Sequence, residues 1–220
     1  MAEKPVTRPI IFSAPMVRAL LDGRKWMTRR LAWRKELEVV EVSSEHLEDY
    51  DVRGIDCREI GHSRWLVRYP SPWQMVKPGD LLWVREGWRT ESRAYDDLAP
   101  SDMDADYPVL YAADADWSLN KTTGRAHPSI HMPRWASRLT LAVTAVKVEK
   151  LQDISEEDAR AEGTPDEPDE HPPSLVFSVL VWDAIHGKGS WRSNPEVVAI
   201  TFTVHRQNVD ALSPPPASRR

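Results

Sequence analysis

The run of residues 139–148, LTLAVTAVKV, is the longest candidate strand in the chain. It is rich in β-branched side chains, which pack well on the pleated surface of a sheet. Shorter strands are expected at residues 10–12, 81–85 and 197–204, because each is a short apolar or alternating run. Strands therefore provide the framework of the predicted fold.

Three segments predict helices: residues 13–22, 154–163 and 175–185. Ser13 and Ser155 stand where an N-cap is needed at the start of the first two, and glycines follow their ends. Strands outnumber helices and do not alternate with long helices. This pattern favours an α+β fold, a small β-barrel with peripheral helices, over a parallel α/β sheet.

Composition excludes several classes of protein. A chain of 220 residues with 41% hydrophobic residues is able to bury a core, while its net charge of -5 disfavours indiscriminate binding to duplex DNA. Cys57 is the only cysteine, which excludes an intrachain disulfide and a Cys-rich zinc site. No apolar run approaches the roughly 18–20 residues of a membrane span, and the start of the chain lacks an apolar signal segment, so a cytoplasmic location is expected.

Basic residues and tryptophan occur together in three stretches: residues 23–30 (GRKWMTRR), 77–86 (KPGDLLWVRE) and 131–138 (HMPRWASR). This combination suits a pocket for a flat, phosphate-bearing ligand, because a base stacks on an indole and arginine binds phosphate in a bidentate manner. From these stretches and the nearby Trp88 we select candidates for substrate binding, with the three tryptophans as stacking candidates. They are Arg24, Arg30, Trp83, Arg85, Glu86, Trp88, His131, Arg134 and Trp135.

No metal ion or other cofactor is expected. Asp102, Asp104 and Asp106 alternate as in a calcium loop, but the glycine and the glutamate that an EF-hand requires are missing. His131 has only His127 close to it in sequence, and that spacing falls in a proline-bearing loop. We interpret the three aspartates as parts of a solvated loop and assign no metal to His131.

Taken in order, these features resemble the ASCH domain of the PUA-like β-barrel superfamily, especially its elaborated phage and prophage forms. The resemblance rests on Gly-x-Lys-x-x-Thr-x-Arg at residues 23–30, on the Pro-Gly-Asp turn at 78–80 before an apolar strand, and on the helix at 154–163. It implies a domain over residues 10–205 with insertions near 31–75 and 90–130. The flanking segments are then an N-terminal extension, 1–9, and a disordered tail, 206–220.

The resemblance also implies an activity. Small bacterial members of the family are amidohydrolases that remove the acetyl group from N4-acetylcytidine with a lysine, a threonine three residues later, and a glutamate on a downstream helix. Lys25, Thr28 and Glu162 match these positions. Thr28 would then be the nucleophile, Lys25 its base, and Glu162 the group that carries a proton for N4 or orients a water. The insertions are the departure from the small members, since an insertion can cap a pocket or abolish it.

Other interpretations remain open at this point. By themselves, Lys25 suits a solvated helix end, Thr28 an ordinary turn and Glu162 a helix surface. A non-catalytic reader of RNA or of a modified base is the first alternative function, favoured by the insertions and the basic-aromatic stretches. A ribonuclease, with Lys25 and His131 as its cleavage pair, is the second. The expected partner is a modified nucleoside or RNA, without stable binding to duplex DNA or a membrane.

Overall fold

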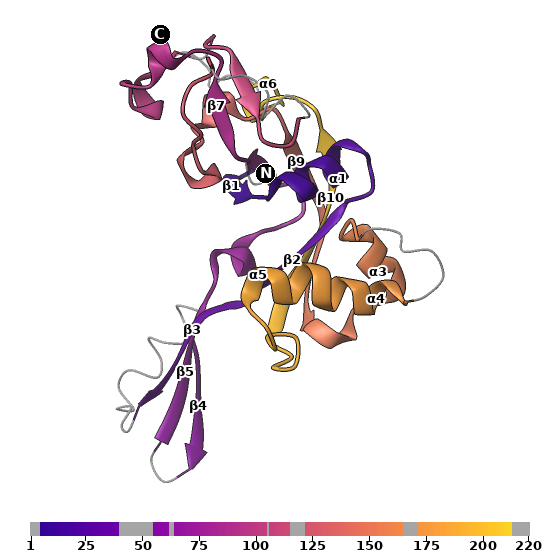
Figure 1. Cartoon of the computed structure of the whole chain (residues 1–220). Coiled ribbons are helices and arrows are strands. Elements are labelled where there is room, and N and C mark those ends of the chain that lie inside the picture. The colour runs from indigo at the N-terminus through magenta and orange to yellow at the C-terminus, as the bar shows by residue number, and fades with distance from the viewer. Residues whose placement is uncertain are drawn as a thin grey trace.

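The structure is a computed structural model that describes residues 5–39, 55–61, 64–104, 106–114, 122–164 and 171–212. These residues form sheets of five, three and two strands, with a few short helices (Figure 1). The expectation of a mixed α+β protein is therefore confirmed. None of the described helices is long and apolar enough to cross a membrane.

The five-stranded sheet forms the centre of the molecule. Its first two strands run parallel, and every other neighbouring pair is antiparallel. The run that we took as the longest strand lies in the middle of this sheet, between two partners. In spatial order the strands are β1 (Thr7–Ile11), β6 (Leu81–Arg85), β9 (Thr140–Lys150), β10 (Glu196–His205) and β2 (Met27–Leu31).

The edge strands β1 and β2 are not paired with each other within the described residues, so the five-stranded sheet is not a closed barrel. A side chain nevertheless connects the two edges. Arg30 of β2 donates a hydrogen bond from Nη2 to the carbonyl of Ile11 at 2.8 Å, and its guanidinium lies 5.1 Å from the centre of the Phe12 ring. The expected barrel is thus not confirmed by strand pairing.

The main core lies between the sheet and α1 (Ala14–Leu21). Leu82 and Val84 of β6 are both buried, as the alternation along that strand predicts, and Val17 and Leu20 face them from the helix. The helix begins after Ser13, whose side chain makes no capping bond within the described residues, and it has a proline in its first turn. Packing and proline, more than a cap, therefore define its start.

A helical layer covers the β2 side of the sheet (Figure 1). Ser155 caps the first of its helices by accepting a hydrogen bond from the backbone N–H of Asp158 at 3.1 Å. A second hydrophobic cluster, which includes Phe177, Trp182 and Val197, holds the layer together. Its elements are α3 (Glu156–Ala161), α4 (Pro173–Val176), the π-helical segment η8 (Phe177–Asp183) and α5 (Ala184–His186).

The insertion near residues 31–75 forms an arm that projects from the main sheet (Figure 1). Three antiparallel strands build it, β3 (Trp33–Val39), β4 (Asp56–Gly61) and β5 (Arg64–Pro70), with β5 in the middle. The arm returns to the sheet through a short 3₁₀ turn, η1 (Pro72–Met75). The described residues of this insertion are thus mostly in β-strands.

The insertion near residues 90–130 has a small core of its own. β7 (Trp88–Thr90) pairs with β8 (Val109–Tyr111), and Trp88, Met103 and Met132 are buried together beside them. We interpreted Asp102, Asp104 and Asp106 as parts of a solvated loop, and the cluster shows that this insertion nevertheless has a packed core. The 3₁₀ turns in and near it are η2 (Arg93–Tyr95), η3 (Pro100–Asp102), η5 (Ser129–His131) and η6 (Arg134–Ala136), and a further turn, η7 (Leu151–Asp153), precedes α3.

The two ends of the domain differ from the predicted boundaries. β1 begins at Thr7, inside the expected extension 1–9. Part of the expected tail is ordered, because α6 (Val209–Leu212) packs its Val209 into the protein and the side chain of Asn208 bonds to three carbonyls. Residues 213–220 lie outside the described residues.

Two glycines with positive φ allow a direct test of the packing between α1 and α3. Gly163 has φ +78°, and a Cβ there would lie 2.9 Å from the Cβ atoms of Ala19 and Lys25, whereas Gly23, φ +74°, has open space. We expect Gly23→Ala to lower the free energy of unfolding by about 1–2 kcal/mol through backbone strain alone. Gly163→Ala adds a steric cost of about 1–3 kcal/mol. Urea unfolding of both variants measures the difference, and equal losses would contradict the close approach.

Candidate functional site

Lys25 and Glu162 form a fully buried ion pair. Lys25 follows the end of α1, where its backbone N–H bonds to the carbonyl of Ala19, and it forms a β-bridge with Glu162. Its Nζ donates to Glu162 Oε2 at 2.7 Å and to the Glu162 carbonyl at 2.8 Å. The two side chains are only 0% and 2% exposed. The alternative that these are ordinary solvated residues is therefore wrong.

Arg29 holds the other side of the Glu162 carboxylate. Its Nη1 lies 3.3 Å from Glu162 Oε1, and its Nη2 lies 2.6 Å from Asp158 Oδ2 and 2.7 Å from Glu149 Oε1. Each oxygen of Glu162 thus faces a cation, and Arg29 is fixed in turn by two further carboxylates. Sequence analysis did not select Arg29, because nothing in the Thr-Arg-Arg run distinguishes this arginine from the next.

Burial destabilises the charged form of Lys25. It lowers the pKa of Lys25 below its ordinary 10.5, while the nearby Glu162 carboxylate opposes the change and the cations Arg30 and Arg29 add to it. Burial also lowers the pKa of Arg30 to about 10, again against the effect of Glu162. Since the charged ammonium is costly away from water, burial favours the neutral form of the Lys25 amine. Such a neutral amine is a usable base.

Thr28 lies on β2, between Lys25 and Arg30 in the sequence. It is 3% exposed, and its hydroxyl has no hydrogen-bond partner among the described residues. Because side chains alternate along a strand, Thr28 shares a face of β2 with Arg30, whereas Arg29 points to the other face. Both Arg30 and the Lys25 Nζ approach the Phe12 ring, at 5.1 and 5.5 Å from its centre. Thr28 and Arg30 therefore share the face of β2 from which Arg30 reaches the Phe12 ring.

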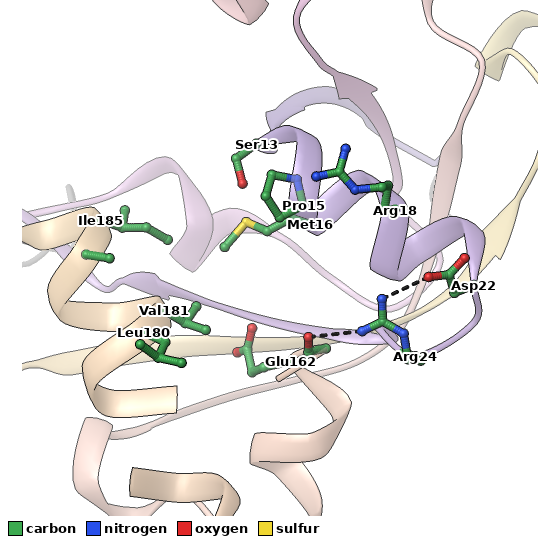
Figure 2. A pocket seen from close by; sticks show the side chains of 12 residues that line it. Ser13, Pro15, Met16, Arg18, Asp22, Arg24, Glu162, Leu180, Val181 and Ile185 are labelled. Atoms are coloured by element: carbon green, nitrogen blue, oxygen red, sulfur yellow. Dashed lines mark hydrogen bonds and ion pairs between the residues drawn. The ribbon is translucent and has the colours of Figure 1, made fainter. Parts of the chain in front are cut away.

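Glu162 opens onto a cavity of about 380 Å³ between α1 and the helical layer (Figure 2). Figure 2 shows the Glu162 carboxylate at the floor, with Met16 above it and Leu180 and Val181 beside it. Arg24 closes one end, where it pairs with Asp22 at 2.8 Å. The lining residues are Ser13, Pro15, Met16, Arg18, Asp22, Arg24, Glu162, Gly163, Leu180, Val181, Ala184 and Ile185.

The walls of this cavity are mostly aliphatic, and the wall opposite α1 comes from a π-helical segment. Leu180 and Ile185 are 54% and 53% exposed, although the periodicity of residues 175–185 predicted an ordinary packed helix. The π-helical hydrogen-bond pattern is rare and is frequent at functional sites. Sequence analysis missed Met16, Leu180 and Val181, because apolar spacing does not show which apolar side chains border a cavity.

The tryptophans that we selected for stacking do not line this cavity. Trp88 is completely buried, stacked on His127 with ring centres 4.5 Å apart, and Trp135 meets its edge at 6.1 Å. Trp83 is largely buried on β6, with the Arg85 guanidinium 5.5 Å from its ring. Our assignment of these residues to the ligand pocket is corrected: Trp88 and Trp135 form the core of the second insertion, because the same side chains serve packing and stacking equally well.

The remaining candidates attach that insertion to the sheet. Glu86 is buried and paired with Arg138 at 2.9 Å, and burial raises the pKa of Glu86 while Arg138 opposes the change. Arg85 donates to a backbone carbonyl of η5, the turn that carries His131. Arg134 pairs with Asp210 of α6 at 2.7 Å. The structure therefore separates these residues from Lys25, whereas it brings Arg24 and Arg30 close to the pair.

No metal centre is present among the described residues. Within that part of the chain, no three or more His, Cys, Asp or Glu side chains gather in a way that could hold a metal ion. The carboxylates around Arg29 and Lys25 are instead engaged by these cations. Of Lys25, Thr28 and Glu162, only Glu162 lines the cavity, while Lys25 is bonded to it and Thr28 is buried on β2.

Comparison with known proteins gives no match. No protein-family model matches the chain, and neither a curated protein nor a solved structure matches it. The resemblance drawn from its motifs therefore remains a proposal, and the function depends on the residues of the cavity.

The buried pair predicts strong energetic coupling. Lys25→Met leaves Glu162 with Arg29 as its only partner, and Glu162→Gln leaves Lys25 buried without a carboxylate. We expect each change to cost about 3–5 kcal/mol of unfolding free energy, and the double variant to cost clearly less than the sum. Urea unfolding of the four proteins measures this coupling.

The exposed pair of Arg24 with Asp22 provides the matched control, because its side chains are 44% and 55% exposed. Coupling in the cycle of Arg24→Met and Asp22→Asn should be at most about 1 kcal/mol. A Lys25–Glu162 coupling no larger than this value would refute the buried pair.

Proposed function

We propose that this protein is an amidohydrolase of the ASCH type, with a PUA-like fold, that removes an acyl group from N4-acetylcytidine or a related modified base. The observation that supports the proposal is the fully buried Lys25–Glu162 pair, whose glutamate lies at the floor of a cavity. Burying such a pair is often no better for stability than an apolar pair of the same volume. Strongly perturbed ionisable groups in a cavity are therefore candidates for catalysis.

The three groups divide the work of amide hydrolysis. Thr28 Oγ1 attacks the acyl carbonyl carbon while neutral Lys25 Nζ accepts the hydroxyl proton. As the bond from carbon to N4 breaks, the proton passes through Glu162 to N4, which leaves as the amine of cytosine. Water then hydrolyses the ester on Thr28, releasing the carboxylic acid and restoring the hydroxyl. Arg29 acts as a positioning residue, because it fixes Glu162.

The cavity suits a flat base with a small acyl group. Its volume of about 380 Å³ lies in the range of small-molecule sites. Met16 on one wall and Leu180 and Val181 on the other offer aliphatic surfaces to both faces of a planar ring. Arg24 at the rim is placed to meet a carbonyl or phosphate oxygen. Aliphatic side chains thus take the place that we had assigned to tryptophan.

No observation favours the ribonuclease alternative. Its cleavage pair needed His131 next to Lys25, but His131 lies on η5 and does not line the cavity. A non-catalytic reader would use the same cavity, and it differs from the enzyme only in whether the acyl group is released. A turnover experiment therefore separates these two functions.

The first experiment is incubation of the purified protein with N4-acetylcytidine, followed by chromatography for cytidine and acetate. We expect release by the wild type and a loss of at least about 100-fold in kcat for Thr28→Val, which removes the hydroxyl at nearly constant volume. Thr28→Ser keeps a hydroxyl and should retain measurable turnover. Thr28→Val is preferred to Lys25→Ala because it leaves the buried ion pair intact.

Either of two results would contradict this mechanism. Wild-type turnover by Thr28→Val would exclude the nucleophile. Absence of release by the wild type, with the nucleoside bound, would favour the reader.

The pH dependence of turnover reports on the lysine. Because neutral Lys25 is the active form, kcat/KM should rise with pH through the apparent pKa of the pair, and burial places that rise below pH 10.5. Arg30→Gln removes a positive charge that lowers the pKa of Lys25, so the rise should move to higher pH. Arg24→Gln is the control and should leave it in place. A shift to lower pH in Arg30→Gln would be inconsistent with Lys25 as the base.

A further inference from the structure

A second cavity, of about 320 Å³, lies where the arm meets the main sheet, and we call it the basic groove. Four cations from distant parts of the sequence line it: Arg34 of β3, Arg58 of β4, Arg68 of β5 and Lys150 at the end of β9. Glu196 is its only acidic lining residue. The groove is therefore basic in a chain whose net charge is -5.

One of these arginines is fully occupied by neighbouring groups. Arg68 pairs with Glu196 at 2.6 Å, bonds to Asp56 at 2.6 Å through Nε, and lies 4.3 Å from the centre of the Trp33 ring. Trp33 Nε1 also donates to Glu196 at 2.9 Å. Both carboxylates are thereby engaged, and this cluster forms the rigid base of the groove.

The other three cations are less fully engaged: among the described residues only Lys150 faces a carboxylate, that of Glu196 on the neighbouring strand, and its charge helps to lower the pKa of Glu196. Arg34, Arg58 and Lys150 are exposed, and within the described residues none of them forms an ion pair. With both carboxylates counted, the groove keeps a net positive charge of two. These three cations come from three different strands and repel each other, so bringing them together does not stabilise the fold. An anion bound between them would offset this repulsion.

The basic groove and the Glu162 cavity are connected through residues 25–31, because Lys25 binds Glu162 and Leu31 lines the groove. Leu31, which lines the groove, is the last residue of β2, and Lys25 stands six residues before it. At about 3.3 Å per residue, the two sites are on the order of 20 Å apart. A single nucleoside cannot reach both, whereas about six nucleotides at a stacked spacing of 3.4 Å span that distance.

We propose that the basic groove binds the phosphodiester backbone of a single-stranded nucleic acid whose modified base enters the Glu162 cavity. Arg34 and Arg58 hold phosphate oxygens through their planar guanidinium groups, and Lys150 adds a point charge. The link between groove and cavity rests on the proposed function, while backbone binding by the groove does not. The substrate is then a polymer rather than a free nucleoside.

The test measures binding of a short, fluorescently labelled, single-stranded RNA with one N4-acetylcytidine, by anisotropy over a series of salt concentrations. The double variant Arg34→Gln/Arg58→Gln should raise Kd at least tenfold at low salt. It should also reduce the slope of log K against log salt by about 1.4, since each contact to a single strand contributes about 0.7. Both residues are exposed, so the fold should be preserved, as a thermal melt will show.

Arg93→Gln/Arg125→Gln is the matched control. These two exposed arginines lie in the second insertion, around a different cavity, and their removal changes the net charge by the same amount. Their variant should keep the wild-type Kd and slope. Equal losses in both double variants, or an unchanged Kd in the groove variant, would overturn the proposal.

Further experiments identify the ligand and separate the two proposals. DNA of the same sequence shows whether the groove distinguishes the sugar, and binding of either polymer through the groove supports backbone recognition. Polyglutamate that binds through the groove as tightly as RNA would overturn it in favour of an acidic protein partner. The groove variant should hydrolyse free N4-acetylcytidine like the wild type but deacetylate the RNA at least tenfold more slowly. If the wild type hydrolyses neither substrate, the proposed function fails. The anisotropy measurement still shows whether the basic groove binds RNA.

Discussion

The buried ion pair between Lys25 and Glu162 is the interaction on which the rest of the structure depends. It joins the end of α1 to the end of α3 across 137 residues of sequence, and a β-bridge between the same residues accompanies it. A buried charge without its partner costs several kcal/mol, so the two helix ends have to meet closely. This explains why only a glycine fits at position 163, against Ala19 and Lys25. Both the stability of the fold and the proposed chemistry therefore require the ends of α1 and α3 to lie close together.

Because side chains alternate along β2, the neighbouring residues Arg29 and Arg30 make contacts on opposite faces of the strand. Arg29 points to the acidic side chains of the helical layer and fixes Glu162, while Arg30 reaches the carbonyl of Ile11 on the opposite edge of the sheet. Thr28 shares the face of Arg30. The chain then continues from Leu31, the last residue of β2, into β3 of the arm, and Leu31 itself lines the basic groove. One element therefore positions the catalytic candidates and connects them to a second charged site.

The two insertions have different structural roles, and none of their described residues lines the cavity. The first forms a three-stranded arm with the basic groove at its base. The second is held by a core around Trp88 and by the pairing of Glu86 with Arg138. The cavity itself is bordered by α1 and the π-helical segment, so its walls are aliphatic and its polar groups are concentrated at the floor and one end.

The sequence alone determined the mixed α+β class, the central strand at residues 139–148 and the strand and helix that flank it, because these follow from side-chain periodicity and capping within short windows. The resemblance singled out Lys25, Thr28 and Glu162, but periodicity placed the first and last in water, where charged helix ends usually lie. Only the tertiary structure decided that they are buried, that Arg29 supports them and that Trp88 packs a core. Burial and charge pairing arise between segments more than a hundred residues apart, and no local pattern records which segments meet.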